Sequence, residues 1–341
     1  AATLAAVMVG YNVILGQTPE GQPIRLLNES VLNGTILMIL VTCTIASFAA
    51  QKGAHNLAAV QTSDTDDTNE NTQERILIPI SNEETAEELV NLSLAIKSKN
   101  NLRNLYALNV MDNQSNDEHK LKKSRKLLEN AVLTAAATDT NMQELLRYDL
   151  NVPNAILSVI LEHQISDLIL GLHKEKGISN SFLGRITEDI LNHSDVTTLI
   201  YKPVQPLSTM KRHLVVIPEK AEKEAGFVQW VTRIGNTLQN TGSKGIFYGS
   251  RATIERLKVL LAKQSNAPEY IEFTDWEDFL IVFRDIKKDD NLWIIFSRRD
   301  QISFQPSMNR IAGYLDKYFT HNSFILVYPL QARMTGNRYL T

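Results

Sequence analysis

The sequence passes twice through the same order of elements, and this repeat limits the possible folds more than any other feature. A short apolar run at residues 75–80 opens one series, and a similar run at residues 213–217 opens another. In each series, apolar runs typical of strands alternate with stretches whose apolar residues have helical spacing. Such alternation predicts a parallel sheet covered by helices on both faces. We therefore expect an α/β fold with two tandem doubly wound parallel-sheet domains, at residues 75–204 and 210–331.

Two details of the second copy are open to interpretation. Residues 249–251 (Gly-Ser-Arg) follow a predicted strand and could form an anion-binding turn, although Ser250 is more typical of a plain helix N-cap. Trp276, Phe279 and Phe283 have the spacing of one helix face. This spacing predicts a helix that turns its aromatic rings into the core.

The first 54 residues differ in composition from the rest of the chain. They contain four charged side chains, and residues 31–50 contain none. Twenty uncharged residues are enough for a helix to cross a hydrocarbon core about 30 Å thick. A buried helix of a soluble domain is the alternative, but Lys52 after the run favours a membrane span. We expect residues 1–54 to be the last one or two helices of a transmembrane domain, and the chain to be a fragment of a longer protein.

The segments around this span predict a turn and a linker. Residues 1–16 are too short to cross a membrane alone, and we interpret them as the end of a helix. Prolines and a glycine in residues 17–30 predict a turn between the two helices. Residues 61–74 are acidic and contain no apolar side chain, so we expect a flexible acidic linker at residues 55–74.

Composition argues against several classes of function. The net charge of -3 disfavours a nucleic-acid partner bound through a broad basic surface. One cysteine excludes an internal disulfide framework and a cysteine-based zinc cluster. The sequence has no G-x-S-x-G turn, and its histidines lack metal-ligand spacing. We expect no catalytic residue, no metal site, no required cofactor and no enzymatic activity.

The first copy resembles the universal stress protein family over about residues 75–203. The segments RILIPIS, NAILSVILEHQISDLILGLHK and FLGRITEDILNHSDVTTLIYKP carry the resemblance. It implies the fold of that family, which is like that of the adenine-nucleotide alpha-hydrolases, and it implies that two such units pair through their last strands. Residues 197–201 would then pair with residues 324–328. The second copy resembles the family in its layout only.

The same resemblance implies a candidate nucleotide site. Family members that bind nucleotides have a G-x-x-G pattern, nine further residues, then a glycine followed by Ser or Thr, and an acid after the first strand. Gly171 and Gly184 match the first and last glycines, whereas other positions depart from the pattern. Lys174 replaces the middle glycine, Arg185 the hydroxyl residue and Ser81 the acid, while Thr187 keeps a hydroxyl nearby. The resemblance implies ATP or AMP as the ligand, and the alternative is a solvated loop without one. The candidate residues are Ser81, Gly171, His173, Lys174, Gly184, Arg185 and Thr187.

The front of the chain resembles the C-terminal end of monovalent cation:proton antiporters of the sodium/hydrogen exchanger type. The segments AATLAAVMVGYNVILG and LLNESVLNGTILMILVTCTIASFAAQKGA carry this resemblance. It implies exchange of sodium or potassium for protons through acidic residues upstream of this chain. It also implies a multi-pass, homodimeric protein of the cell inner (plasma) membrane, with the two α/β domains as a cytoplasmic regulatory tail. The alternative is a universal stress-type nucleotide-binding module that the apolar front anchors to the lipid bilayer.

Overall fold

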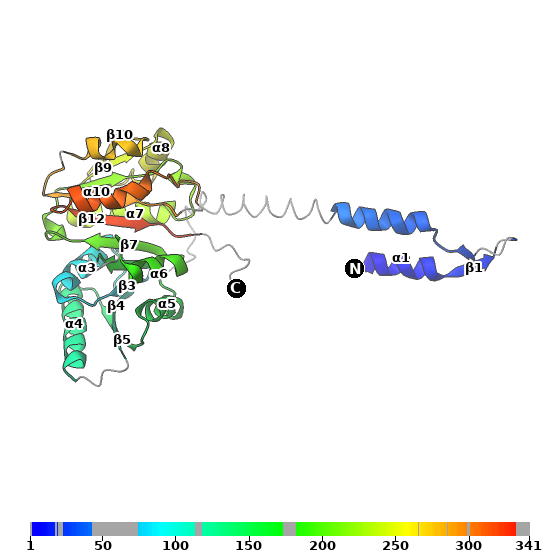
Figure 1. Cartoon of the computed structure of the whole chain (residues 1–341), viewed down its shortest axis with the longest axis horizontal. Helices are drawn as coiled ribbons and strands as arrows, with labels where there is room; N and C mark the ends of the chain where they lie inside the picture. The colour runs from blue at the N-terminus through cyan, green and yellow to red at the C-terminus, as the bar shows by residue number, and fades with distance from the viewer. Residues whose placement is uncertain are drawn as a thin grey trace. The chain divides into compact units, whose positions relative to one another are not determined.

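The computed structural model describes residues 2–17, 19, 23–42, 74–112, 118–172, 182–264, 266–284, 286–298 and 301–331. The chain forms two compact units, Ala1–Glu70 and Asn71–Thr341. Figure 1 shows the chain and labels most of the helices and strands.

The described part of the N-terminal unit contains two helices joined by a β-hairpin. Helix α1 (Ala2–Asn12) leads into β1 (Ile14–Gln17), which pairs antiparallel with β2 (Pro23–Arg25). The hairpin stands where the sequence predicted a plain turn. Arg25 fastens it to α1, because its guanidinium lies 4.2 Å from the centre of the Tyr11 ring and donates to the Tyr11 carbonyl oxygen at 3.0 Å.

The predicted membrane span is described only in part. Its helix is described from residue 29 to residue 42, and residues 43–50 lie outside the described residues, as does the predicted linker up to residue 73. Within the described residues, no helix has the length and apolar character needed to cross a membrane. The hydroxyls of Thr35 and Thr42 donate to backbone carbonyl oxygens one turn earlier, at 2.8 Å, so this helix satisfies both groups on its own backbone.

One ten-stranded sheet forms the centre of the C-terminal unit, in the order β10-β9-β8-β11-β12-β7-β6-β3-β4-β5. The strands of its first half are β3 (Ile76–Pro79), β4 (Leu105–Met111), β5 (Met142–Tyr148), β6 (Asp167–Gly171) and β7 (Thr197–Lys202). Those of its second half are β8 (Arg212–Val216), β9 (Lys244–Gly249), β10 (Glu269–Glu272), β11 (Asp290–Ile295) and β12 (Ser323–Tyr328). In each half the first strand lies in the middle and its neighbours are parallel to it, as a doubly wound sheet requires.

The two halves meet at one antiparallel strand pair. β7 and β12 pair with Tyr201 opposite Ile325 and Leu199 opposite Val327, whereas the other strand pairs of this sheet are parallel. The expected pairing of the last strands is therefore confirmed. Because the strand direction reverses at this pair, the carboxyl ends of the two sets of strands lie at opposite edges of the sheet.

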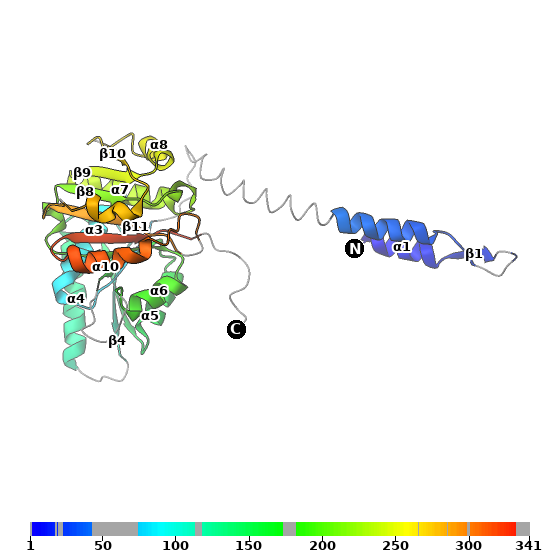
Figure 2. The ribbon, with the colours of Figure 1, turned by 45° about the horizontal axis from the view of Figure 1, so that its top comes forward.

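Helices cover both faces of the sheet. On one face a single hydrophobic core takes side chains from α3 (Glu83–Ile96), α4 (Glu118–Ala136), α7 (Phe227–Thr241) and α8 (Arg251–Leu260). On the other face the core takes them from α5 (Val152–Glu162), α6 (Arg185–His193), α9 (Phe279–Val282) and α10 (Met308–Tyr318). Figure 2 shows α5, α6 and α10 together on the near face.

The aromatic stripe of the second half differs from its prediction in one respect. The structure has a short 3₁₀ helix, η3 (Trp276–Asp278), followed by the single turn of α9 in place of one regular helix. Asp275 accepts a hydrogen bond from the backbone N–H of Glu277 at 2.8 Å, which fixes this tight start. The three rings are nevertheless almost fully buried, so their predicted place in the core is confirmed.

A buried ion cluster also joins the two halves. Arg233 of α7 donates to both carboxylate oxygens of Asp167, at 2.9 and 2.6 Å, and to Glu74 at 2.5 Å. The Asp167 side chain is 0% exposed. Burial opposes the charge of Arg233, but the two carboxylates raise its pKa above the ordinary value. Glu74 also accepts from the backbone N–H of Ser98 at 3.0 Å, so this residue of the predicted linker belongs to the folded unit.

His213 of β8 is a second buried polar group. Its ring is 0% exposed, and its Nδ1 accepts a hydrogen bond from Nε1 of Trp293 at 2.9 Å. Desolvation lowers the pKa of His213 to about 4, so the ring is neutral near pH 7.

We expect His213 to make the stability of the C-terminal unit depend on pH. Its pKa is about 4 in the folded chain against 6.5 for the exposed ring, so between these values the unfolded chain binds more protons. The contribution of the neutral ring is complete above pH 6.5 and decreases as the pH falls toward 4, by up to about 3 kcal/mol. His213→Gln keeps an acceptor for Trp293 but does not titrate, so its free energy of unfolding should depend less on pH in urea titrations. The exposed His321→Gln should follow the wild type, and parallel profiles for wild type and His213→Gln would contradict this account.

Candidate functional site

Part of the predicted site lies at the carboxyl ends of the first-half strands. Ser81 is exposed in the short connection from β3 to α3, and Gly171 is the last residue of β6, next to β3. A Cβ placed on Gly171 would lie 3.4 Å from Cδ1 of Leu89 and 3.8 Å from Oγ1 of Thr85, both on α3. The structure therefore brings Ser81 and Gly171 to the same end of α3.

The start of α3 is not the place where an anion would bind. Asn82 caps this helix by accepting a hydrogen bond from the backbone N–H of Glu84 at 3.0 Å. Glu83 and Glu84 occupy the first turn, so the chain itself supplies the negative charge that the helix dipole favours.

The start of α6 has a different character. Gly184 precedes it with φ 79° and ψ 151°, a backbone conformation that is essentially restricted to glycine. Arg185 is exposed, so its guanidinium is available to a ligand in solvent. Thr187 is 7% exposed, so little of its side chain is accessible to a ligand in solvent, unlike the ligand-facing residue that the sequence suggested.

Two of the predicted residues, His173 and Lys174, lie outside the described residues. Among the described candidates, Ser81 and Gly171 lie at the start of α3, whereas Gly184 and Arg185 lie at the start of α6. Backbone N–H groups at a helix start and an exposed guanidinium are groups that hold a phosphate. Among the described residues, no three or more His, Cys, Asp and Glu side chains are grouped so that they could hold a metal ion.

The corresponding edge of the second half carries carboxylates. Glu224 accepts hydrogen bonds from the hydroxyl of Ser297 at 3.0 Å, from the backbone N–H of Ser303 at 3.3 Å and from the Ser303 hydroxyl. Glu222 accepts from the Thr253 hydroxyl at 2.8 Å. Negative side chains of the chain itself therefore occupy this edge, and they would repel a phosphate group.

Ser250 at the same edge is a helix cap. Its hydroxyl oxygen accepts a hydrogen bond from the backbone N–H of Thr253, at 3.3 Å, at the start of α8. The N-cap interpretation is confirmed, whereas anion binding by residues 249–251 stays a prediction.

A groove that the sequence did not indicate lies at the opposite edge of the first half. It has a volume of about 280 Å³ between the ends of α5 and α6 and the segment after β12, with Leu157, Ile160 and Leu330 in its wall. The backbone N–H of Gln331 closes one side by donating to the Asp195 carbonyl oxygen at 2.9 Å. Segments of both halves form this groove, so only the strand pairing could have revealed it.

Comparison with known families identifies the first half. Residues 73–202 match the Universal stress protein family. The chain therefore contains a universal stress protein family domain, as the resemblance in the sequence implied. No curated protein matches the chain.

Several solved structures are similar to the chain at low sequence identity. A functionally unknown protein from Pseudomonas aeruginosa is similar with a TM-score of 0.51 and 7% identity, over 75% of this chain and 93% of that chain. The cytoplasmic domain of a prokaryotic cation chloride cotransporter has a TM-score of 0.49 and 10% identity, over 76% and 95%. The universal stress protein from Archaeoglobus fulgidus, solved in complex with dAMP, has a TM-score of 0.30 and 15% identity, over 39% and 100%. Identities this low concern the fold alone.

We expect Gly184 to be required by the backbone itself, whether or not a ligand binds. Gly184→Ala should lower the free energy of unfolding by about 1–3 kcal/mol, because a side chain is strained in this conformation. Gly171→Ala is the matched control, since its new Cβ would meet Leu89 at an ordinary contact distance of 3.4 Å. Urea titration should show a much smaller effect there, and equal losses at the two glycines would contradict the argument.

Proposed function

We propose that the chain is the C-terminal part of an integral membrane antiporter that exchanges sodium or potassium for protons. The ten-stranded unit would be its regulatory tail. The observation that carries the proposal is a helix of exposed apolar side chains in the same chain as a universal stress protein family domain. Residues 1–16 and 31–50 contain no Asp or Glu, so the residues that carry the ions would lie upstream.

The helix described from residue 29 to residue 42 supports a lipid environment. Leu37, Met38 and Leu40 are 66%, 57% and 62% exposed. Apolar surface costs free energy in water, about 25 cal/mol per Å², and a continuous exposed patch marks contact with lipid or another protein. The sequence stays uncharged to residue 50, which favours lipid.

The position of Lys52 supports a cytoplasmic location for the large unit. The protein would then be a multi-pass, homodimeric protein of the inner (plasma) membrane with its tail in the cytoplasm. The tail would act on transport by favouring one of two states of the membrane domain, which requires contacts that differ between these states.

We propose a nucleotide, ATP or AMP, as the input of the tail. The first half offers the start of α6 with the exposed Arg185, whereas Glu222 and Glu224 occupy the equivalent edge of the second half. One half would bind the ligand and the other would support it. We propose binding without catalysis, because Ser81, the two glycines and Arg185 form no general acid and base pair.

An alternative function is a membrane-anchored universal stress-type nucleotide-binding module. The family match favours it, because the match covers residues 73–202 and concerns this domain alone. Both proposals require a membrane anchor, but only the antiporter requires further spanning helices with acidic residues.

We expect the full chain to resist alkaline carbonate extraction from membranes. Leu37→Arg with Leu40→Arg should make it extractable, because each arginine near the centre of a span costs about 3 kcal/mol. Leu133→Arg is the control, since Leu133 is a 61% exposed apolar residue of α4. Extraction of the wild-type chain would remove the support for both proposals.

We expect the full chain in detergent to bind ATP or AMP saturably in calorimetric titrations. Arg185→Glu should weaken binding at least about 10-fold, through loss of a charge-assisted hydrogen bond. Arg251→Glu, at the start of α8 in the second half, should leave binding unchanged. Absence of wild-type binding would exclude these nucleotides as the input and leave the membrane assignment standing.

A further inference from the structure

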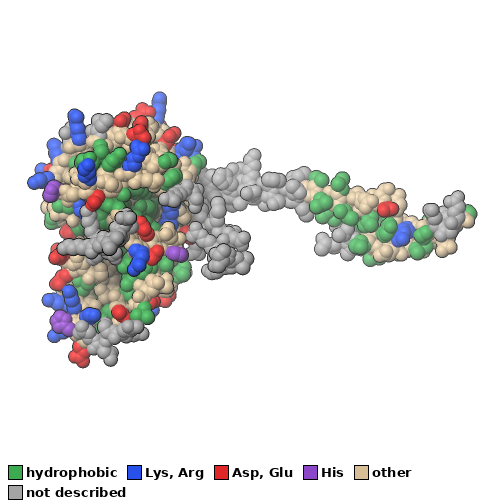
Figure 3. Space-filling model, in the orientation of Figure 1, with side chains coloured by type: hydrophobic (Ala, Val, Ile, Leu, Met, Phe, Trp, Pro, Cys, Tyr) green, Lys and Arg blue, Asp and Glu red, His purple; other side chains and the backbone are tan. Residues whose placement is uncertain are grey.

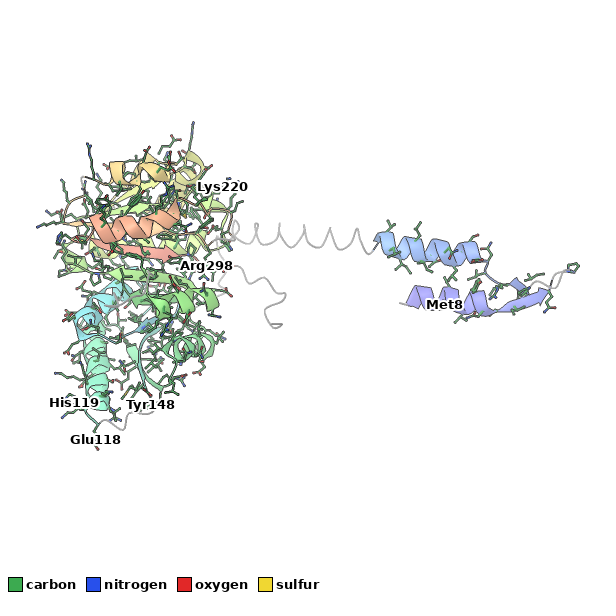
Figure 4. All side chains as sticks on the ribbon, in the orientation of Figure 1. Met8, Glu118, His119, Tyr148, Lys220 and Arg298 are labelled. Atoms are coloured by element: carbon green, nitrogen blue, oxygen red, sulfur yellow. The ribbon has the colours of Figure 1, made fainter. Side chains whose placement is uncertain are left out.

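Helix α4 has two parts with different surroundings. All of its buried side chains, from Leu127 onward, lie in the second part. Residues 118–126 bury none and form what we name the basic arm. Glu118 and His119 lie at the outer end of the helix in Figure 4, so the arm extends away from the hydrophobic core.

The basic arm concentrates positive charge in a chain whose net charge is -3. It has one acid, Glu118, and five cations, which are Lys120, Lys122, Lys123, Arg125 and Lys126. Within the described part of the chain, none of the five forms an ion pair. Figure 3 shows Lys and Arg side chains gathered over this end of α4.

Local physics disfavours this arrangement. The first turns of a helix lie at the positive end of its dipole and favour acids over cations. Lys122 and Lys126 are one turn apart and repel each other. No buried side chain of the arm offsets these costs. These charges go against the dipole and spacing preferences of a helix, and no contact within the fold compensates for them. Such a surface is expected to serve a function other than stability.

The equivalent helix of the second half lacks such an arm. α8 has buried side chains from Thr253 onward, already in its first turn. Its Lys258 forms an ion pair with Glu255 at 3.1 Å. The arm is therefore a feature of the first half and not a requirement of the fold.

We propose that the basic arm docks onto anionic lipid headgroups of the bilayer, an inference that rests on the proposed membrane function. Residues 51–73 can extend at most about 80 Å, so the unit stays within reach of the membrane surface. Anionic lipids attract each Lys or Arg that approaches them within a Debye length. The arm has no Phe, Tyr or Trp side chain on which a nucleic-acid base could stack, and this favours lipid over nucleic acid.

The test uses the full chain reconstituted into vesicles of neutral lipid and of neutral lipid with about one third anionic lipid. Cys43→Ser and Asn130→Cys place one fluorophore on the exposed face of α4, and a headgroup-labelled lipid is the acceptor. We expect energy transfer to be stronger in the anionic vesicles at 0.1 M salt and to be lost at 1 M salt.

Lys122→Glu with Lys126→Glu should lower the ratio of docked to undocked chains about 30-fold. Arg251→Glu with Arg256→Glu, the same charge change on α8, should have little effect.

The outcomes separate this inference from the membrane assignment. Equal energy transfer in neutral and anionic vesicles, or an equal effect of the two double variants, overturns the docking of the arm while the anchor stands. A chain that does not insert into neutral vesicles overturns the anchor. In that case, salt-sensitive co-flotation with anionic vesicles, lost with Lys122→Glu and Lys126→Glu, still supports the arm, and its absence overturns the arm as well.

Discussion

The arrangement of the larger unit depends on the antiparallel pairing of β7 with β12. It joins two five-stranded sheets and reverses the strand direction once, so the carboxyl edges of the two halves face opposite ways.

Each half also has a cationic side chain that contacts the end of a helix in the other half. Lys202 donates to the Phe319 and Thr320 carbonyl oxygens at the end of α10, at 3.1 and 2.7 Å. Arg298 donates to the Leu191 carbonyl oxygen near the end of α6 at 2.5 Å. Both places are the negative ends of helix dipoles, where a cation is stabilising.

The repeat has kept its fold but not its buried polar groups. Asp167 of the first half meets Arg233 and forms an ion pair, whereas the repeat places Asn291 at the equivalent position in the second half. Asn291 lies opposite His213, in a neutral cluster that Trp293 completes. A buried ion pair requires both of its partners, because an unpaired buried charge costs much free energy. A neutral cluster requires its partners less strictly. The first half is thus attached to α7 of the second half by charge. The second half has a buried carboxylate of its own, Asp290, but Arg212 of the same half pairs with it, at 2.7 and 2.6 Å.

Much of the fold could be predicted from the sequence, because its signals are local. Strands β3 and β8 lie within one residue of the apolar runs at residues 75–80 and 213–217, and the repeat together with the family resemblance predicted the pairing of the last strands. The hairpin of β1 and β2 was missed because its strands are short and have no alternating pattern. The contact of Arg233 with Asp167 was missed because it joins residues 66 positions apart and depends on how α7 packs against strand β6. At the candidate site, the sequence identified Gly184 by pattern, but only the backbone angles show why a glycine is needed, and only burial shows that little of the Thr187 side chain is accessible.

The distribution of charge suggests how the two halves divide their roles. In the first half, Arg185 and the basic arm both lie near the carboxyl ends of the strands, because α6 and α4 each begin there. In the second half, the equivalent edge holds Glu222 and Glu224, which are already bonded to hydroxyl groups of their own half. The two edges therefore carry different sets of charged side chains, and the reversal between β7 and β12 places them at opposite ends of the strands. An anionic ligand and an anionic surface would both approach the first-half edge. Binding at Arg185 and docking of the arm would then compete or cooperate through charge alone, with no change of fold.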